Sequence, residues 1–208
     1  MISFARFAFA EKGIIMHLYH YYEKKRGPFL TVMDLPRDDA VKVFQSVEYG
    51  DLPRLPDIEW FLTRRSELEN TVRELFIQKG GKPERKHPHY MTIGTADCFL
   101  APKSWYIEPE FLRIDIGEFD LSTVSFTYGD MFPVFNPNLD KGEEYRNSVY
   151  TFDEITKLIE KYGYPQDWEG VARTQIQRML KYVEAHIWSD GVVGRCRGAW
   201  LADNAGCV

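Results

Sequence analysis

The chain has 208 residues, a net charge of −5 and a sequence pI of about 5.6. An acidic protein of this kind disfavours non-specific binding to nucleic acid, because the phosphates repel it. No stretch approaches the ~20 consecutive apolar residues that a membrane-spanning helix needs, so we expect no membrane association. The three cysteines lack metal-ligand spacing and favour a reducing compartment, so we expect a cytoplasmic protein.

The N-terminal part of the chain is predicted to begin its fold with a strand and a helix. Residues 1–15 are expected to be an extension outside the fold, because Met16 can itself be a translation start. Residues 16–23 form an aromatic-rich run that is typical of a strand. Residues 36–48 are predicted to be helical, since Pro36 stands at the start of a helically spaced apolar stripe.

The clearest helical pattern in the chain spans residues 57–79. Asp57 is a good N-cap, apolar side chains recur at helical spacing, and two consecutive glycines stop the pattern. Glu69 and Arg73 stand four residues apart, in the order that favours an ion pair on one helix face. We therefore expect Glu69 to pair with Arg73 on this helix.

The second half of the chain combines strand patterns with two further helices. Residues 151–163 begin with a capping box and carry a helical apolar stripe, and another helix is expected over residues 167–179. Residues 191–208 are rich in Gly and Ala and lack periodicity, so we expect a frayed extension outside the core. Strand patterns occupy residues 90–95, 112–116, 124–128 and 182–188.

The predicted strands and helices are segregated along the chain. Segregation favours an α+β fold with a mainly antiparallel sheet over a repeated strand–helix–strand unit. The sheet would pack against helices near residues 36–48, 57–79, 151–163 and 167–179. The length suits one globular domain, which we expect to cover residues 16–190.

The densest group of proton-exchanging side chains lies just before the strand expected at residues 90–95. His87 and His89 flank Pro88, and residues two apart on an extended backbone point to the same face. Two adjacent imidazoles can act as an acid–base pair near neutral pH, so we assign both as candidate catalytic residues. A metal site would need a third ligand, and we assign none. Candidates for that third ligand are His20, Glu23 and His186, which shares a strand face with Glu184.

Positive charge clusters beside these histidines. Arg85 and Lys86 can form a cradle for phosphate or carboxylate, in which Arg85 offers bidentate geometry. Tyr90 follows the histidines and adds a hydroxyl group. We therefore expect Arg85, Lys86 and Tyr90 to contact a small anionic ligand. A solvated basic loop is the alternative interpretation.

Three further positions complete the candidate site. Tyr128 and Asp130 end a predicted strand, where polar groups can reach a cleft, and both are candidate catalytic residues. In the alternative, this is a plain strand-turn in which Asp130 makes an Asx-type cap. His20 shares a strand face with Leu18 and Tyr22, so it is either a ligand-binding residue or a hydrogen-bonded core histidine.

The chain also shows two resemblances. Its body over about residues 16–190 resembles a family of uncharacterised bacterial proteins, which implies a bacterial origin and no activity. The segments that carry this resemblance are Leu18–Glu23, Lys86–Thr92, Phe126–Asp130 and Tyr150–Ile155. The strand Leu18–Tyr21 is also similar to the first strand of many ADP-ribosyltransferases, in which a histidine holds the nicotinamide ribose of NAD. By that resemblance, His20 would bind NAD.

Three classes of function follow from these patterns. The first is a protein that binds or processes a small polar, anionic ligand at a pocket lined by His, Arg and Tyr. The second is a NAD-dependent enzyme similar to ADP-ribosyltransferases, built around His20. The third is a non-enzymatic interaction module, because aromatic residues make up 15% of the chain and are enriched at interface centres. The common nucleotide-binding, nucleophile-elbow and zinc-protease motifs do not occur, so no cofactor is assigned.

Overall fold

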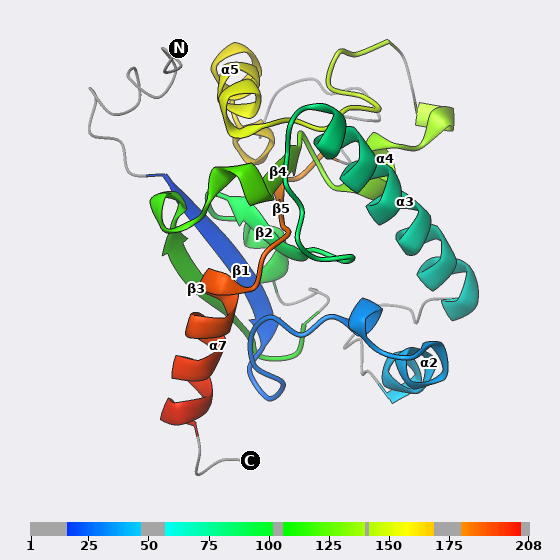
Figure 1. Ribbon diagram of the computed structural model, residues 1–208, viewed down its shortest axis with the longest axis vertical. Coiled ribbons are helices and arrows are strands. Elements are labelled where there is room, and N and C mark those ends of the chain that lie inside the picture. Colours follow the sequence, from blue (N-terminus) through cyan, green and yellow to red (C-terminus); the bar gives the residue numbers. More distant parts are fainter. Residues whose placement is uncertain (1–15, 47–56, 102–105, 140–141, 169–179, 205–208) are drawn as a thin grey trace.

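The computed structural model describes residues 16–46, 57–101, 106–139, 142–168 and 180–204. Within them, five strands form one sheet in the order β3-β1-β2-β5-β4, and every neighbouring pair is antiparallel (Figure 1). The strands are β1 (His17–Glu23), β2 (His89–Ile93), β3 (Pro109–Asp115), β4 (Val124–Thr127) and β5 (Val183–Ile187). The predicted α+β class with an antiparallel sheet is confirmed.

Three of the four predicted helices are confirmed. The α-helices of the described residues are α2 (Arg37–Ser46), α3 (Ile58–Gln78), α4 (Met131–Val134), α5 (Phe152–Tyr162) and α7 (Gly191–Asp203). Asp57 caps α3 by accepting a 2.8 Å hydrogen bond from the Trp60 amide, and Thr151 and Glu154 form the capping box of α5. The helix expected at 167–179 and the extension at 1–15 lie almost wholly outside the described residues. In the described parts, no helix is both long and apolar enough to cross a membrane.

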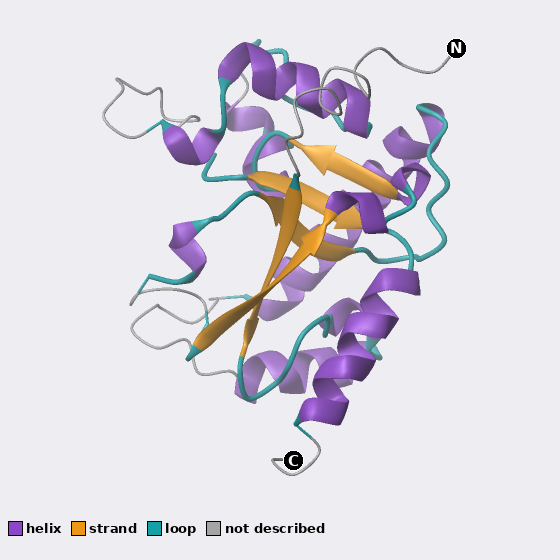
Figure 2. Cartoon of the chain, turned by 90° about the vertical axis from the view of Figure 1, so that its left-hand side faces the viewer, coloured by secondary structure: helices purple, strands orange, loops and turns teal. Residues whose placement is uncertain are grey.

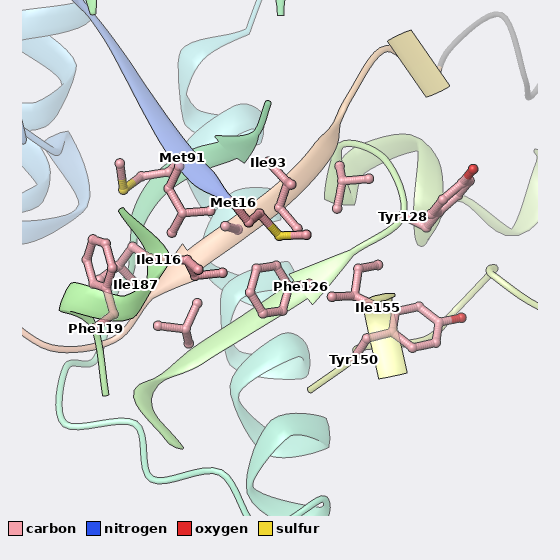
Figure 3. Close-up of a cluster of buried hydrophobic side chains, with 14 of the residues drawn as sticks. Met16, Met91, Ile93, Ile116, Phe119, Phe126, Tyr128, Tyr150, Ile155 and Ile187 are labelled. Carbon is pink, nitrogen blue, oxygen red and sulfur yellow. The ribbon is translucent and has the colours of Figure 1, made fainter. Parts of the chain in front are cut away.

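One face of the sheet is apolar and carries the main hydrophobic core. Because side chains alternate along a strand, every second residue of each strand points to this face. Helices α5 and α7 contribute apolar side chains to the same core, as do segments that follow the strands. Figure 3 shows Phe126 of β4 and Ile155 of α5 within it. Its fully buried members include Leu18, Ile93, Val124, Phe126, Val183, Ala185, Ile187 and Ile155.

The opposite face of the sheet is polar, yet it is also buried. The alternate residues of β2, β5 and β4 place their side chains there, namely Tyr90, Thr92, Glu184, His186, Ser125 and Thr127. Helix α3 covers this face, with Val72 and Phe76 packed against Trp188 just after β5. Figure 2 shows the twisted sheet with helices around it. A buried polar sheet face is costly unless its groups are paired, so the contacts among these side chains decide whether the face is stable.

The C-terminal segment corrects the prediction of an extension outside the core at residues 191–208. Residues Gly191–Asp203 form α7, and Val192 and Val193 are buried in the main core. The helix inserts these two adjacent valines, and the turn after them carries small and charged residues. These residues form no apolar stripe of helical period, so the sequence pattern does not predict this helix.

Candidate functional site

Ionisable and hydrogen-bonding side chains meet between α3 and the polar face of the sheet. We call this group the polar cluster, and its members are Arg65, Glu69, Tyr90, Asp130, Tyr182, Glu184 and His186. They come from α3, from β2 and β5, and from the residues just before α4 and β5. Buried ionisable groups in close contact are typical of functional sites, because their charge and protonation are set by the surroundings.

Glu69 is the centre of the α3 side of the cluster and is completely buried. Its Oε1 accepts hydrogen bonds from Arg65 Nε at 2.9 Å and from the Tyr90 hydroxyl at 2.6 Å. Its Oε2 lies 2.5 Å from His87 Nδ1. Burial acts to raise the pKa of Glu69, but the bond to His87 and the charge of Arg65 outweigh it, so the pKa lies below its ordinary value. Glu69 is therefore held as a carboxylate.

The expected pair of Glu69 with Arg73 is wrong. Glu69 pairs with Arg65, one turn earlier, which lies on the side of α3 that meets the sheet. Arg73 instead donates to the backbone carbonyls of Pro83 and Arg85, in the segment that follows the helix. Both arginines stand four residues from Glu69, and the packing of α3 decides between them.

Arg65 combines a fixed position with unused donors. Its guanidinium carbon lies 4.6 Å from the centre of the Tyr90 ring, and its Nε is bound to Glu69. Within the described residues, Nη1 and Nη2 of Arg65 donate no hydrogen bond. Burial opposes the charge, but Tyr90 and the Glu69 carboxylate outweigh it and raise the pKa of Arg65 above its ordinary value. The side chain is 20% exposed, so solvent reaches it.

Glu184 and His186 lie side by side on β5 and are linked to β4. Trp188 Nε1 donates to Ser125 Oγ at 2.8 Å, and Ser125 Oγ lies 3.2 Å from His186 Nδ1. His186 Nε2 lies 2.9 Å from Glu184 Oε1. Since an indole N–H only donates, the Ser125 hydroxyl can donate to Nδ1, which places the proton of a neutral ring on Nε2, facing Glu184. The chain of bonds fixes the position of the Glu184 carboxylate.

A serine, a histidine and a glutamate in sequence invite comparison with a nucleophilic triad. In such triads the serine contacts Nε2 and the acid contacts Nδ1, whereas here the two are exchanged. Ser125 and His186 are also fully buried, so a substrate has no access to the hydroxyl. Ser125 therefore positions His186 and Glu184 and does not act as a nucleophile.

Asp130 lies next to Glu184 and is partly exposed. Its Oδ1 accepts a 2.8 Å hydrogen bond from the Phe132 amide, and its Oδ2 accepts a 3.0 Å bond from the Tyr182 hydroxyl. The predicted Asx-type cap at Asp130 is thus confirmed, at the start of α4. Burial and the charge of Glu184 raise the pKa of Asp130 to about 6, so this carboxyl group exchanges its proton close to neutral pH.

His87 and His89 do not lie side by side, which corrects the expected imidazole pair. His87 contacts Glu69 under α3, whereas His89 Nε2 lies 3.4 Å from Asp190 at the start of α7. The backbone bends over residues 85–87, so the alternation of an extended strand does not apply there. Among the described residues, no group of three or more His, Cys, Asp or Glu side chains is arranged to hold a metal ion.

Arg85 also differs from the expected anion cradle. Its terminal nitrogens bind Asp34 and Asp190, and its Nε donates to the His87 carbonyl at 2.9 Å. Each nitrogen already has a protein acceptor, so Arg85 joins three segments of the chain. Lys86 is exposed to solvent. Of the predicted ligand contacts, the structure brings only Tyr90 into the polar cluster.

His20 and Tyr128 lie outside the cluster as well. His20 Nδ1 lies 2.8 Å from the Tyr90 carbonyl, and its Nε2 accepts a 2.8 Å bond from the Phe29 amide. Burial lowers the pKa of His20 to about 4, so the ring is neutral, with both nitrogens occupied. Tyr128 is fully buried in the apolar core and donates to the Gly163 carbonyl at 2.5 Å. Both side chains have the contacts of structural residues.

Comparisons with known proteins identify no relative of this chain. The two resemblances noted in the sequence therefore stay predictions, and function is argued from the geometry of the polar cluster. No protein-family model, no curated protein and no solved structure matches the chain.

Proposed function

We propose that the protein binds, and can process, a small polar ligand with an anionic group at the polar cluster. The observation that carries this proposal is the state of Arg65. Its guanidinium is held by Glu69 and by the face of Tyr90, while its two terminal nitrogens have no acceptor among the described residues. A planar guanidinium with its fork free is suited to bidentate binding of a carboxylate or phosphate.

The carboxyl groups beside Arg65 support a role in proton transfer. Partial burial and the negative charge of Glu184 raise the pKa of Asp130 to about 6. A general acid or base works best when its pKa lies near the working pH. Glu184 is held in place by the Met131 amide, 3.3 Å away, and by His186. In this proposal Arg65 anchors the anionic group, and Asp130 exchanges a proton with a hydroxyl or amine of the ligand.

Two other features bear on the proposed function, namely the expected cellular compartment and the contacts of His20. The cytoplasm remains the expected compartment, on the basis of the sparse cysteines. An NAD site at His20 is not favoured, because both ring nitrogens are already bonded to the backbone. The contacts of Arg65 favour the small-ligand function over that alternative.

The proposal is tested by replacing Arg65 with lysine. Arg65→Lys keeps the positive charge beside Glu69 but removes the fork, and Lys86→Ala removes an exposed charge as the matched control. Inorganic phosphate, citrate and glycerol 3-phosphate serve as anionic probes in a titration followed by backbone-amide NMR. We expect saturable shifts at α3, β2 and β5 with at least one probe. Arg65→Lys should weaken that binding about tenfold, a loss typical of charge-assisted bidentate contacts, and Lys86→Ala should leave it unchanged.

Two outcomes would overturn the proposal. One is the absence of saturable shifts near Arg65 with any of the three probes. The other is equal affinity of the original protein and Arg65→Lys for a probe that does bind. Lysine can preserve the ion pair with Glu69, so we expect the variant to keep its fold. The amide spectrum of the variant checks this directly.

A further inference from the structure

A hollow of about 260 Å³ lies where β1 begins and β2 ends, and no member of the polar cluster lines it. It is formed by the start of β1, the turn after β2 and the segment that follows α5. The described part of its lining combines apolar, aromatic and polar side chains, and none of these residues is Lys or Arg. The lining residues are Met16, His17, Tyr19, Ile93, Gly94, Thr95, Tyr164, Gln166 and Asp167.

Gln166 lines this hollow, and its side chain carries a buried acceptor that has no partner among the described residues. Its Nε2 donates a 2.9 Å hydrogen bond to the Ile93 carbonyl, while its Oε1 is buried and has no partner among the described residues. The amide orientation is fixed, because the reverse orientation would place Oε1 against the Ile93 carbonyl. A buried acceptor without a donor costs free energy, so it points to a donor that another molecule supplies.

Gly94 allows the close approach of the Gln166 amide. Its φ of +73° is a conformation that other residues rarely adopt, and a Cβ at this position would lie 3.1 Å from Gln166 Nε2. The turn after β2 therefore leaves room for the amide to reach the Ile93 carbonyl. That contact holds Oε1 in its buried position.

The groups around Gln166 define which donor would fit. Asp167 is exposed at the rim and makes no side-chain hydrogen bond within the described residues. Tyr19 and Tyr164 contribute aromatic rings to the same hollow. A carboxylate, a carbonyl oxygen and aromatic faces all attract an ammonium group, which has three donors and a positive charge. Among the described residues of this lining, a carboxylate or phosphate would find no Lys or Arg.

We infer that this hollow binds a small organic amine in its ammonium form, with Gln166 Oε1 and Asp167 as the acceptors. The site is separate from the polar cluster and does not depend on the function proposed there. Apolar contacts with Ile93 and Met16 would hold the body of the amine, and the tyrosine rings would flank its charge.

The test compares two probes of the same shape and opposite charge. Tyramine carries the ammonium group, and 3-(4-hydroxyphenyl)propionate carries a carboxylate in its place. Tyramine is expected to give saturable NMR shifts at Gly94, Thr95 and the side-chain amide of Gln166, and the carboxylate is not. Asp167→Asn should weaken tyramine binding about five- to tenfold, as expected for loss of a charge-assisted bond. Asp38→Asn removes an exposed carboxylate on α2 and should have no effect.

The outcomes separate this inference from the function proposed at Arg65. Arg65→Lys should leave tyramine binding unchanged, so a failure at one site does not imply a failure at the other. Equal binding of the two probes would overturn the inference, as would equal tyramine affinity of Asp167→Asn and the original chain. The absence of any shift at the Gln166 side chain would show that the hollow holds water only.

Discussion

The hydroxyl of Tyr90 donates a 2.6 Å hydrogen bond to Oε1 of Glu69 and so joins the middle of the sheet to helix α3. The same oxygen accepts from Arg65, and the other oxygen of Glu69 contacts His87. One buried carboxylate thus contacts side chains from α3, from β2 and from the segment before β2. The geometry of Arg65, on which the proposed ligand site depends, is set by this carboxylate.

Replacing Glu69 should therefore destabilise the fold more than replacing any one of its partners. Glu69→Gln leaves the mostly buried Arg65 without its counter-charge, and we expect a loss of about 3–5 kcal/mol in the free energy of unfolding. Tyr90→Phe removes one hydrogen bond and should cost about 1–2 kcal/mol. Urea denaturation measures both. Glu67→Gln, which breaks an exposed pair with Arg64, is the control and should cost under about 1 kcal/mol. A Glu69→Gln cost no larger than that of Glu67→Gln would contradict this role.

The strands and most helices were predictable from the sequence because their signals are local. Asp57 at the start of α3 and the capping box of α5 each act within one turn of helix, and β-strand alternation acts between neighbours. The polar cluster was not predictable in the same way. Arg65 and Arg73 are equally spaced from Glu69, and only the packing of α3 on the sheet brings Arg65 to the buried side.

The observed site differs from the predicted site around His87 and His89 for the same reason, because its contacts join residues that are far apart in the sequence. The dense group of charges and imidazoles around His87 lies next to the polar cluster, and Tyr90 belongs to that cluster. The bend over residues 85–87 then separates His87 from His89, and distant carboxylates occupy Arg85. The two partners of Arg85 lie 51 and 105 residues away from it. Neither they nor the bend can be recognised from the local sequence pattern.

Asp130 should make part of the stability depend on pH. Its pKa is raised from 3.8 to about 6 in the folded protein, so the unfolded chain releases this proton first as the pH rises. Folding stability should therefore fall between about pH 4 and pH 6, by about 2 kcal/mol after allowance for partial exposure. Asp130→Asn can still cap α4 and should remove this loss. The difference in unfolding free energy between variant and original should grow across that interval, and a constant difference would contradict the assignment.

His20 should contribute a pH dependence of the opposite sign. Burial lowers its pKa from 6.5 to about 4, so the unfolded chain binds this proton first as the pH falls. The stability that the neutral ring provides is complete above about pH 6.5 and is lost as the pH approaches 4. Imidazole ¹⁵N NMR should show a neutral ring with its proton on Nδ1 at pH 5.5, because Nε2 accepts from the Phe29 amide. A ring that is already protonated at that pH would contradict the assignment.

The windows of Asp130 and His20 overlap, so the pH profile of the original chain does not separate them. Their variants do, because each removes one contribution and leaves the other. His20→Ala also leaves the Phe29 amide without its acceptor, and should cost about 2–4 kcal/mol at neutral pH. The profile of His20→Ala should then lack the His20 contribution and keep the loss that Asp130 causes.

Helix α7 should be part of the cooperative fold, because Val193 is 3% exposed and belongs to the main core. Val193→Ala should lower the free energy of unfolding by about 1–3 kcal/mol, through lost burial and the cavity left behind. Leu201 stands two turns later on the same helix and is 46% exposed, so Leu201→Ala should change stability by less than about 0.5 kcal/mol. Urea denaturation of both full-length variants makes the comparison. Equal costs for the two variants would mean that α7 does not dock through its valines, and the buried state of this helix would then be wrong.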